Sequence, residues 1–191
     1  MVHPYEKLPD NLPIPQDDNA CDHLPGMALP NKDLPSTQDD VVNLGKLRGW
    51  VVVYCYPMTG QPGIELPEGW DDIPGARGCT PQSCAFRDHY SELQDFNAEV
   101  FGLSTQPTAY QKEIAQRVHL PFRLLSDQNL KLCQALNLPT FTIDSLMHIN
   151  STLIKRTTLI AKDGIIRAVH YPVFPPHADA DWVLDYLKSA S

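Results

Sequence analysis

The sequence predicts a mixed α/β fold, in which helices cover both faces of a central β-sheet of parallel and antiparallel strands. First, a continuous β-branched and aromatic run at residues 50–56 is typical of a strand buried on both faces. Second, apolar strand-like runs alternate with helical patterns between residues 80 and 136. Third, two strand patterns joined by Lys162-Asp163-Gly164, a hairpin signal, precede a final amphipathic helix. The order βα-βα-βα-ββα implies such a layered sheet.

The individual elements follow from these patterns. The strand at 50–56 ends at Pro57, because proline cannot donate a hydrogen bond to a sheet. Helices are expected where apolar residues recur at helical spacing. Thr80 is a suitable N-cap for the first helix, Pro81 suits its first turn, and Thr108 is the candidate cap of the second. The other expected strands are residues 41–47, 99–103, 122–125, 153–161 and 165–171, and the expected helices are residues 80–96, 110–118, 127–136 and 177–190.

The 191 residues suffice for one domain with extensions. Residues 1–40 are rich in Pro, Asp and Asn, and their prolines exclude a long helix. Two interpretations of this N-terminal extension stay open: an irregular arm with a short hairpin near Gly26 that lies across the domain, or a disordered tail. We therefore divide the chain into a proline-rich arm, residues 1–40, and one α/β domain, residues 41–191.

Composition restricts the class of protein. The net charge of −8 and the lack of a basic run argue against a nucleic-acid-binding protein. No apolar stretch approaches the ~20 residues that a membrane-spanning helix needs. Residues 1–15 lack the apolar core of a signal peptide. We therefore expect a cytoplasmic protein that binds neither nucleic acid nor membrane.

The chain has five cysteines, and an odd number does not suggest a secreted disulfide framework. Neither the C-x4-C spacing nor the scattered histidines resemble a zinc site, and nucleotide and flavin motifs are absent. No metal or cofactor is therefore expected. Cys55 and Cys133 lie in apolar patterns and are expected in the core, whereas Cys21 is expected to be a bystander.

Cys79 has the sequence context of a reactive thiol. It follows a glycine-containing turn at the start of a predicted helix, where unpaired N–H groups and the helix dipole favour a thiolate. Arg77 adds positive charge, and a long loop, residues 58–77, leads to the cysteine. The alternative is that Cys79 and Cys84 are ordinary half-buried residues of an amphipathic helix.

The strand that ends in Tyr-Pro, the segment Gly-Cys-Thr-x-x-x-Cys-x-Phe-Arg-Asp and the later Lys-Arg-Thr-Thr-Leu strand together resemble the peroxiredoxins. The match is to the Q-type, or bacterioferritin-comigratory, branch, and it covers about residues 40–190. The resemblance implies a thioredoxin-like fold with an N-terminal extension. It also implies that Cys79 is the peroxidatic cysteine, Cys84 the resolving cysteine, and Arg156 the residue that activates the thiolate and binds the peroxide.

The chain departs from the family pattern just before Cys79. The family places a proline seven residues, and a Thr or Ser three residues, before the cysteine, where this chain has Asp72 and Ala76. An insertion of roughly fifteen residues separates Cys79 from Pro57 and Thr59, the nearest equivalents. We expect Pro57 to shield the pocket and Thr59 to supply the hydroxyl, with Thr80 as the fallback.

The five-residue spacing also constrains disulfide formation. In one regular helix the two Cα atoms would lie about 8–9 Å apart, beyond the roughly 7 Å that a disulfide allows, so the first turn must unwind. If Thr80 caps the helix instead, Cys79 precedes the cap and can approach Cys84 without full unwinding. We hypothesise that the first turn is helical when reduced and unwinds on oxidation.

The resemblance implies a thiol-dependent peroxidase for hydrogen peroxide and organic hydroperoxides, reduced by thioredoxin or a glutaredoxin-type dithiol and acting as a monomer or homodimer. Two other functions are considered. A thioredoxin-like disulfide oxidoreductase usually has C-x-x-C, which is absent here. A non-catalytic binding module would use the 58–77 loop with Trp70 as its anchor.

Overall fold

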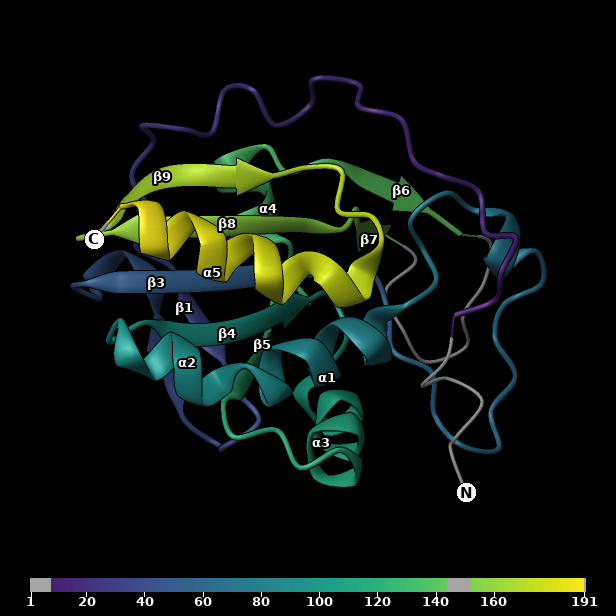
Figure 1. Cartoon of the computed structure of the whole chain (residues 1–191). Helices are drawn as coiled ribbons and strands as arrows, with labels where there is room; N and C mark the ends of the chain where they lie inside the picture. Colours follow the sequence, from purple (N-terminus) through teal and green to yellow (C-terminus); the bar gives the residue numbers. More distant parts are fainter. Residues whose placement is uncertain (1–7, 144–151, 191) are drawn as a thin grey trace.

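The computed structural model describes residues 8–143 and 152–190. Its centre is a five-stranded sheet of order β5-β4-β3-β8-β9 (Figure 1). The pairs β3–β4 and β4–β5 are parallel, whereas β3–β8 and β8–β9 are antiparallel, which confirms the predicted mixed sheet. The strands are β3 (Trp50–Cys55), β4 (Glu99–Ser104), β5 (Arg123–Ser126), β8 (Thr157–Lys162) and β9 (Ile165–His170).

Helices cover both faces of the sheet, but unequally. One face packs against α1, α2, α3 and α5 through a cluster that includes Phe86, Ile114 and Val183. The opposite face packs against α4 through Leu132 and Leu136, and against the N-terminal segment (Figure 1). The helices are α1 (Cys79–Asp88), α2 (Tyr90–Asp95), α3 (Thr108–Arg117), α4 (Lys131–Leu136) and α5 (Asp179–Ser189).

Strand β3 is buried on both sides, as its continuous apolar sequence predicts. Val52 and Tyr54 face the helices α1 and α5, and Val51 and Val53 face the other layer. Cys55 is fully buried in that second layer, which confirms its predicted place in the core.

The described part of the arm, residues 8–40, supplies much of the second layer. Leu24, Leu29 and Leu34 are buried in the same cluster as the sheet. The backbone N–H of Leu29 donates to the Gly164 carbonyl, and residues 26–28 pair with the edge strand β9 at Ile166 rather than forming a hairpin with each other. Strand β1 (Asp33–Pro35) pairs with β2 (Val41–Asn43), so the boundary expected after residue 40 falls inside this hairpin.

The first helix begins earlier than expected. Its N-cap is Gly78, at φ +109°, and Cys79 is the first helical residue, so the expected cap at Thr80 is wrong. The left-handed backbone of a glycine starts the helix here, and the N–H of Gln82 donates to the Gly78 carbonyl. The predicted helix over 80–96 is two helices that meet at His89. Thr108 likewise begins α3, and Pro107 is the cap.

Other element boundaries also differ from the predictions. The predicted strand at 153–161 is broken at Lys155 and Arg156 into β7 (Thr152–Ile154) and β8. β7 pairs with β6 (Thr140–Thr142), which no sequence pattern indicated. α4 is shorter than expected because Leu130, at φ +56°, lies outside it as the N-cap; the Asp127 carboxylate accepts N–H groups of its first turn. Short 3-10 helices lie at Leu44–Lys46, Trp70–Asp72 and Pro176–Ala178.

Candidate active site

Cys79 lies at the start of α1 and is only 3% exposed. The turn that delivers it depends on Gly78, because an added Cβ there would lie 2.6 Å from Pro176 Cγ and 2.8 Å from Leu8 Cδ2. The Cys79 Sγ lies 3.7 Å from the Ala76 carbonyl oxygen. The sulfur is therefore held between the end of the long loop and the positive end of a ten-residue helix.

Arg156 contacts the Cys79 sulfur from a distant part of the chain. It occupies the break between β7 and β8, and its Nη2 donates to Cys79 Sγ at 3.1 Å. Its guanidinium also donates to the carbonyls of Gly75 (3.3 Å), Ala76 (3.1 Å) and Arg77 (3.2 Å). Because the guanidinium is buried, it places a positive charge directly against the sulfur, and its bonds to the loop carbonyls fix the turn that carries Cys79.

A buried polar chain continues from Arg156 to the C-terminal helix. Arg156 Nη1 donates to Gln82 Oε1, and Gln82 Nε2 donates to Asp179 Oδ2 at 2.7 Å. Asp179 also accepts hydrogen bonds from Thr158 Oγ1 (2.6 Å) and His170 Nδ1 (2.7 Å). Sequence patterns did not single out Gln82 or Asp179; the only local signal for Gln82 is its place three residues after Cys79.

Cys84 lies on the same uninterrupted helix as Cys79 and is half-buried. None of the five cysteines forms a disulfide in this structure. Since Gly78 rather than Thr80 is the cap, both cysteines are helical, which is the first of the two geometries considered above.

The two candidate hydroxyls, those of Thr59 and Thr80, have different surroundings in the structure. Thr59, although buried, donates through its Oγ1 to Gln106 Oε1 (3.2 Å), and its backbone N–H donates to the same oxygen (3.0 Å). Thr80 is buried beside Cys79, and both line one small cavity. Pro57, expected to shield the pocket, is also buried. Of the two threonines, Thr80 lines the cavity beside the sulfur, and the Thr59 hydroxyl donates to Gln106.

The long loop before Cys79 covers the sulfur. The cavity beside Cys79 has a volume of about 10 Å³, which is room for roughly one water molecule. Met58, Leu66 and Trp70 from the loop form part of its wall. Trp70 is 3% exposed, and its ring centroid lies 6.2 Å from that of Phe141 on β6.

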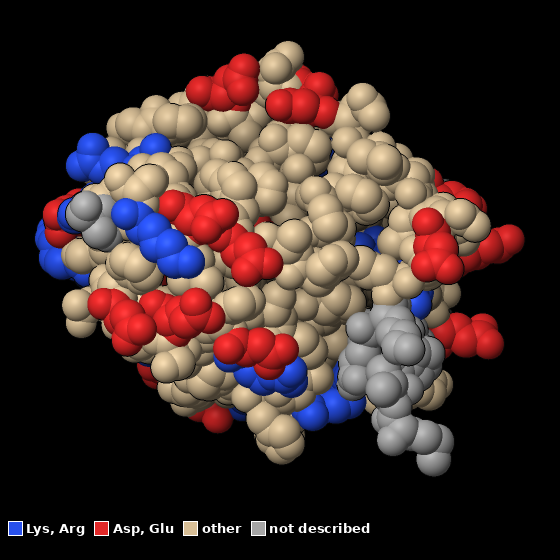
Figure 2. Space-filling model, viewed as in Figure 1, with Lys and Arg blue, Asp and Glu red and all other residues tan. Residues whose placement is uncertain are grey.

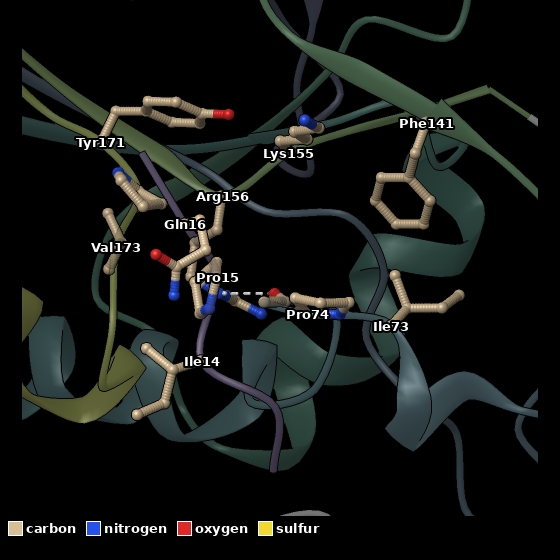
Figure 3. A pocket seen from close by; sticks show the side chains of 12 residues that line it. Ile14, Pro15, Gln16, Ile73, Pro74, Phe141, Lys155, Arg156, Tyr171 and Val173 are labelled. Atoms are coloured by element: carbon tan, nitrogen blue, oxygen red, sulfur yellow. Dashed lines mark hydrogen bonds between the residues drawn. The ribbon is translucent and has the colours of Figure 1, made fainter. Parts of the chain in front are cut away.

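A larger pocket, of about 300 Å³, lies beside Arg156 (Figure 3). Figure 3 shows Arg156 between the arm at Pro15 and the loop at Pro74, with Phe141 on one side and Val173 on the other. The lining is mostly apolar, and the arm and the inserted loop both contribute to it. Cys79 does not line this pocket, so the guanidinium stands between the pocket and the sulfur.

The other three cysteines are neutral core residues. Burial raises the pKa of the Cys21 thiol and of the Cys133 thiol to about 11. Burial also raises the pKa of Cys55 well above its usual value. Cys133 packs with Leu132 and Leu136, as predicted. Cys21 is buried as well, with its sulfur 4.0 Å from Thr157 Oγ1.

Comparison with known proteins gives a family match over most of the chain. The model of the family described as Redoxin matches residues 24–184. Peroxiredoxin Q of the chloroplast from Oryza sativa subsp. japonica is 32% identical over 165 residues, which is 86% of this chain and 66% of the rice protein. The chain thus spans slightly less than two thirds of that relative. Peroxiredoxin Q from Sedum lineare is also 32% identical, over 86% of this chain and 77% of its own length.

Solved structures resemble the fold. Peroxidoxin BcpB from Mycobacterium tuberculosis superposes with a TM-score of 0.70 at 25% identity, covering 88% of this chain and 99% of that one. A cysteine-to-serine mutant of PrxQ from Xylella fastidiosa gives a TM-score of 0.68 at 22% identity, over 88% and 98% of the two chains. These likenesses confirm the thioredoxin-like architecture that the mixed sheet and its flanking helices indicate.

Proposed function

The chain belongs to the Redoxin family, and from that premise, with relatives that are peroxiredoxins of the Q type, we propose that it is a thiol-dependent peroxidase. Its substrates are hydrogen peroxide and organic hydroperoxides. The single observation that carries the proposal is the 3.1 Å contact between Arg156 Nη2 and Cys79 Sγ at the start of α1.

In the first step the Cys79 thiolate attacks one oxygen of the peroxide. An S–O bond forms as the O–O bond breaks, and the leaving oxygen takes up a proton and departs as water or an alcohol. The sulfur is thereby oxidised to a sulfenic acid. Arg156 supports this step because its charge stabilises both the thiolate and the negative charge that grows on the leaving oxygen. Thr80 is the proposed hydroxyl beside the sulfur.

In the second step the Cys84 thiol attacks the sulfenic acid of Cys79, forms a disulfide and releases water. Both residues lie in one regular helix, where five residues give a rise of about 7.5 Å, so their Cα atoms are too far apart for a disulfide. The first turns of α1 must therefore unwind. An external dithiol then reduces the disulfide and becomes oxidised itself; thioredoxin or a glutaredoxin-type protein is the proposed reductant.

The test combines turnover with identification of the disulfide. We expect the wild-type protein to consume hydrogen peroxide with thioredoxin and its reductase, Cys79→Ser to lose turnover, and Cys133→Ser to retain it as the matched control. Peptide mapping after one equivalent of peroxide should give a Cys79–Cys84 disulfide. A Cys79–Cys133 or intermolecular disulfide would overturn the role of Cys84. Insulin reduction without peroxide consumption would favour the disulfide-oxidoreductase alternative, and full activity of Cys79→Ser would favour the binding module.

Location and assembly are also proposals. No helix within residues 8–143 and 152–190 is long and apolar enough to cross a membrane. The net charge of the chain is −8, and acidic and basic side chains are interspersed on the face seen in Figure 2. We propose a cytoplasmic monomer or homodimer, although the plant relatives are chloroplast proteins. Cell fractionation and size-exclusion chromatography test these two points.

A further inference from the structure

The buried carboxylate of Asp179 lies at the far end of the polar chain that starts at Cys79. Asp179 is the first residue of α5, and it is 0% exposed. We propose that Asp179 is a positioning residue, which acts through Gln82 to orient Arg156 against the Cys79 sulfur. This inference rests on the proposed peroxidase function, because it assigns a role in that reaction.

The chemistry of the Gln82 amide carries the inference. An amide has one acceptor end and one donor end, and here the acceptor Oε1 faces the guanidinium of Arg156. The donor Nε2 faces the Asp179 carboxylate at 2.7 Å. Turning the amide over would place its oxygen against a carboxylate and its NH₂ group against a cation, which is unfavourable at both ends. The charge of Asp179 therefore selects which end of Gln82 meets Arg156.

Asp179 is itself held from two other elements. Thr158 on β8 donates to Oδ2 at 2.6 Å, and His170 at the end of β9 lies 2.7 Å from Oδ1. The His170 ring stacks on Trp182 of α5, with ring centroids 4.6 Å apart. These contacts leave the carboxylate little freedom to rotate. Asp179 also lies in the first turn of α5, at the positive end of the helix.

Loss of the Asp179 charge should change the reactivity of the Cys79 sulfur. In Asp179→Asn, with the His170 Nδ1–H bonded to the remaining oxygen, the NH₂ group takes the place of Oδ2, repels the Gln82 NH₂ group and permits the amide to turn over. Arg156 would then lose its side-chain acceptor and keep only the loop carbonyls and the sulfur. We expect the second-order rate constant of Cys79 with hydrogen peroxide to fall by about tenfold to a hundredfold.

A reciprocal exchange tests the mechanism directly. In the double variant Gln82→Glu, Asp179→Asn, the new carboxylate accepts hydrogen bonds from Arg156 and from the Asn NH₂ group. The hydrogen-bond chain is thereby restored, and Arg156 still donates to the side chain at position 82. Gln82→Glu alone places two carboxylates side by side and should be impaired. The matched control is Asp181→Asn, which removes a charge from the same turn of α5 at a side chain that is 63% exposed and contacts His89.

Two readouts separate positioning from folding and from the proposed function. The first is the rate constant with peroxide, and the second is the pH profile of Cys79 alkylation by iodoacetamide, which requires no turnover. We expect both to change in Asp179→Asn, to recover to within about threefold in the double variant, and to stay unchanged in Asp181→Asn. If the wild type fails to consume peroxide, the proposed function falls, but the alkylation profile still tests Asp179.

The inference is overturned if Asp179→Asn behaves like the wild type in both readouts, or if the folded double variant shows no recovery. Should Asp179→Asn fail to fold, Gln82→Leu provides the test, because it leaves Asp179 bonded to Thr158 and His170. A normal rate and alkylation profile in Gln82→Leu would then overturn the inference, and a loss in both that the double variant Gln82→Glu, Asp179→Asn restores would support it.

Discussion

At the scale of single residues, Gly78 determines where the sulfur of Cys79 lies. Its φ of +109° is strained for any L-residue with a side chain, and a Cβ would meet Pro176 and Leu8 at less than 3 Å. Both restrictions act on the residue immediately before the reactive cysteine. The position of Cys79 therefore depends on a glycine that has no reactive group.

We predict that Gly78→Ala lowers the free energy of unfolding by more than about 2 kcal/mol and slows the reaction of Cys79 with peroxide. The matched control is Gly49→Ala, since Gly49 has φ +76° but nothing within 4 Å of the added Cβ. The control should cost only the backbone strain, about 1–2 kcal/mol, and leave the peroxide rate unchanged. Urea unfolding and stopped-flow kinetics measure the two effects; equal losses in both variants would contradict the steric argument.

The buried thiols predict a dependence of stability on pH. Cys21 and Cys133 have folded pKa values raised to about 11, so in the folded protein they keep their protons where the unfolded chain loses them. The unfolded state then binds fewer protons than the native state, and stability falls as the pH rises between about 9 and 11. We predict that the double variant Cys21→Ala, Cys133→Ala loses less stability than the wild type over this range, measured by urea unfolding at each pH.

The residues of the site differ in how far the sequence reveals them. Cys79, Cys84 and Arg156 stand in contiguous motifs, so they could be named before the fold was known. The role of Asp179 arises only when α5 packs beside α1, and no local pattern records that contact. Thr59 was a candidate by its place after Pro57, and no sequence pattern indicated that its hydroxyl donates to Gln106, 47 residues later. Residues that stand in a local motif can be predicted from the sequence, whereas side chains that reach the site only through tertiary packing cannot.

At the scale of elements, α1 must be both ordered and able to unwind. In the reduced protein it is one helix from Cys79 to Asp88, with Gln82 and Phe86 buried. We predict that oxidation to the Cys79–Cys84 disulfide speeds amide hydrogen exchange at residues 79–85 by about tenfold or more. Residues 108–117 of α3 serve as the internal control. Nearly unchanged exchange at residues 79–85 would contradict the unwinding.

The inserted loop is a second element with a predicted function. Trp70, Leu66 and Met58 leave a cavity of about 10 Å³ beside Cys79, so the loop limits the size of what reaches the sulfur. We predict that Trp70→Ala increases the rate with cumene hydroperoxide relative to hydrogen peroxide by about tenfold, at a cost of roughly 3–5 kcal/mol in stability. Trp50→Ala, at the start of β3, is the control and should leave this ratio unchanged. An unchanged ratio in Trp70→Ala would mean that the loop does not restrict access.

The predicted helices and strands were correct where the apolar periodicity was strong. They were wrong where the backbone conformation of single residues set the element boundaries. The strand at 50–56 and the C-terminal helix have clear apolar patterns, and both formed within two residues of the expected limits. The helix start was misplaced because a glycine at positive φ took the cap position from Thr80. The break at Arg156 was missed because the apolar pattern continues on either side of it, although this break is what turns the guanidinium toward Cys79.

At the scale of the whole molecule, the N-terminal arm shares with α4 the covering of one face of the central sheet. The sheet face opposite α1 and α5 is covered by α4 and by apolar residues of the arm, several of which are almost fully buried. The arm also reaches the pocket beside Arg156 through Ile14, Pro15 and Gln16. A proline-rich composition excluded a long helix and left open whether the arm lies across the domain or is disordered, because its contacts with β9 are made by the backbone.

We therefore predict that the arm is a structural part of the domain and that weakening its contacts lowers the free energy of unfolding of the whole domain. Leu29→Ala should lower the free energy of unfolding by about 2–5 kcal/mol, because it opens a cavity under the sheet while the N–H of Leu29 still bonds to Gly164. Val41→Ala, at a side chain that is 62% exposed on the neighbouring strand β2, is the matched control and should change stability by less than about 0.5 kcal/mol. Urea unfolding followed by Trp fluorescence measures both. If the two variants lose the same stability, the arm rests on the sheet without contributing to the core, and the domain begins at residue 41 as the composition alone suggested.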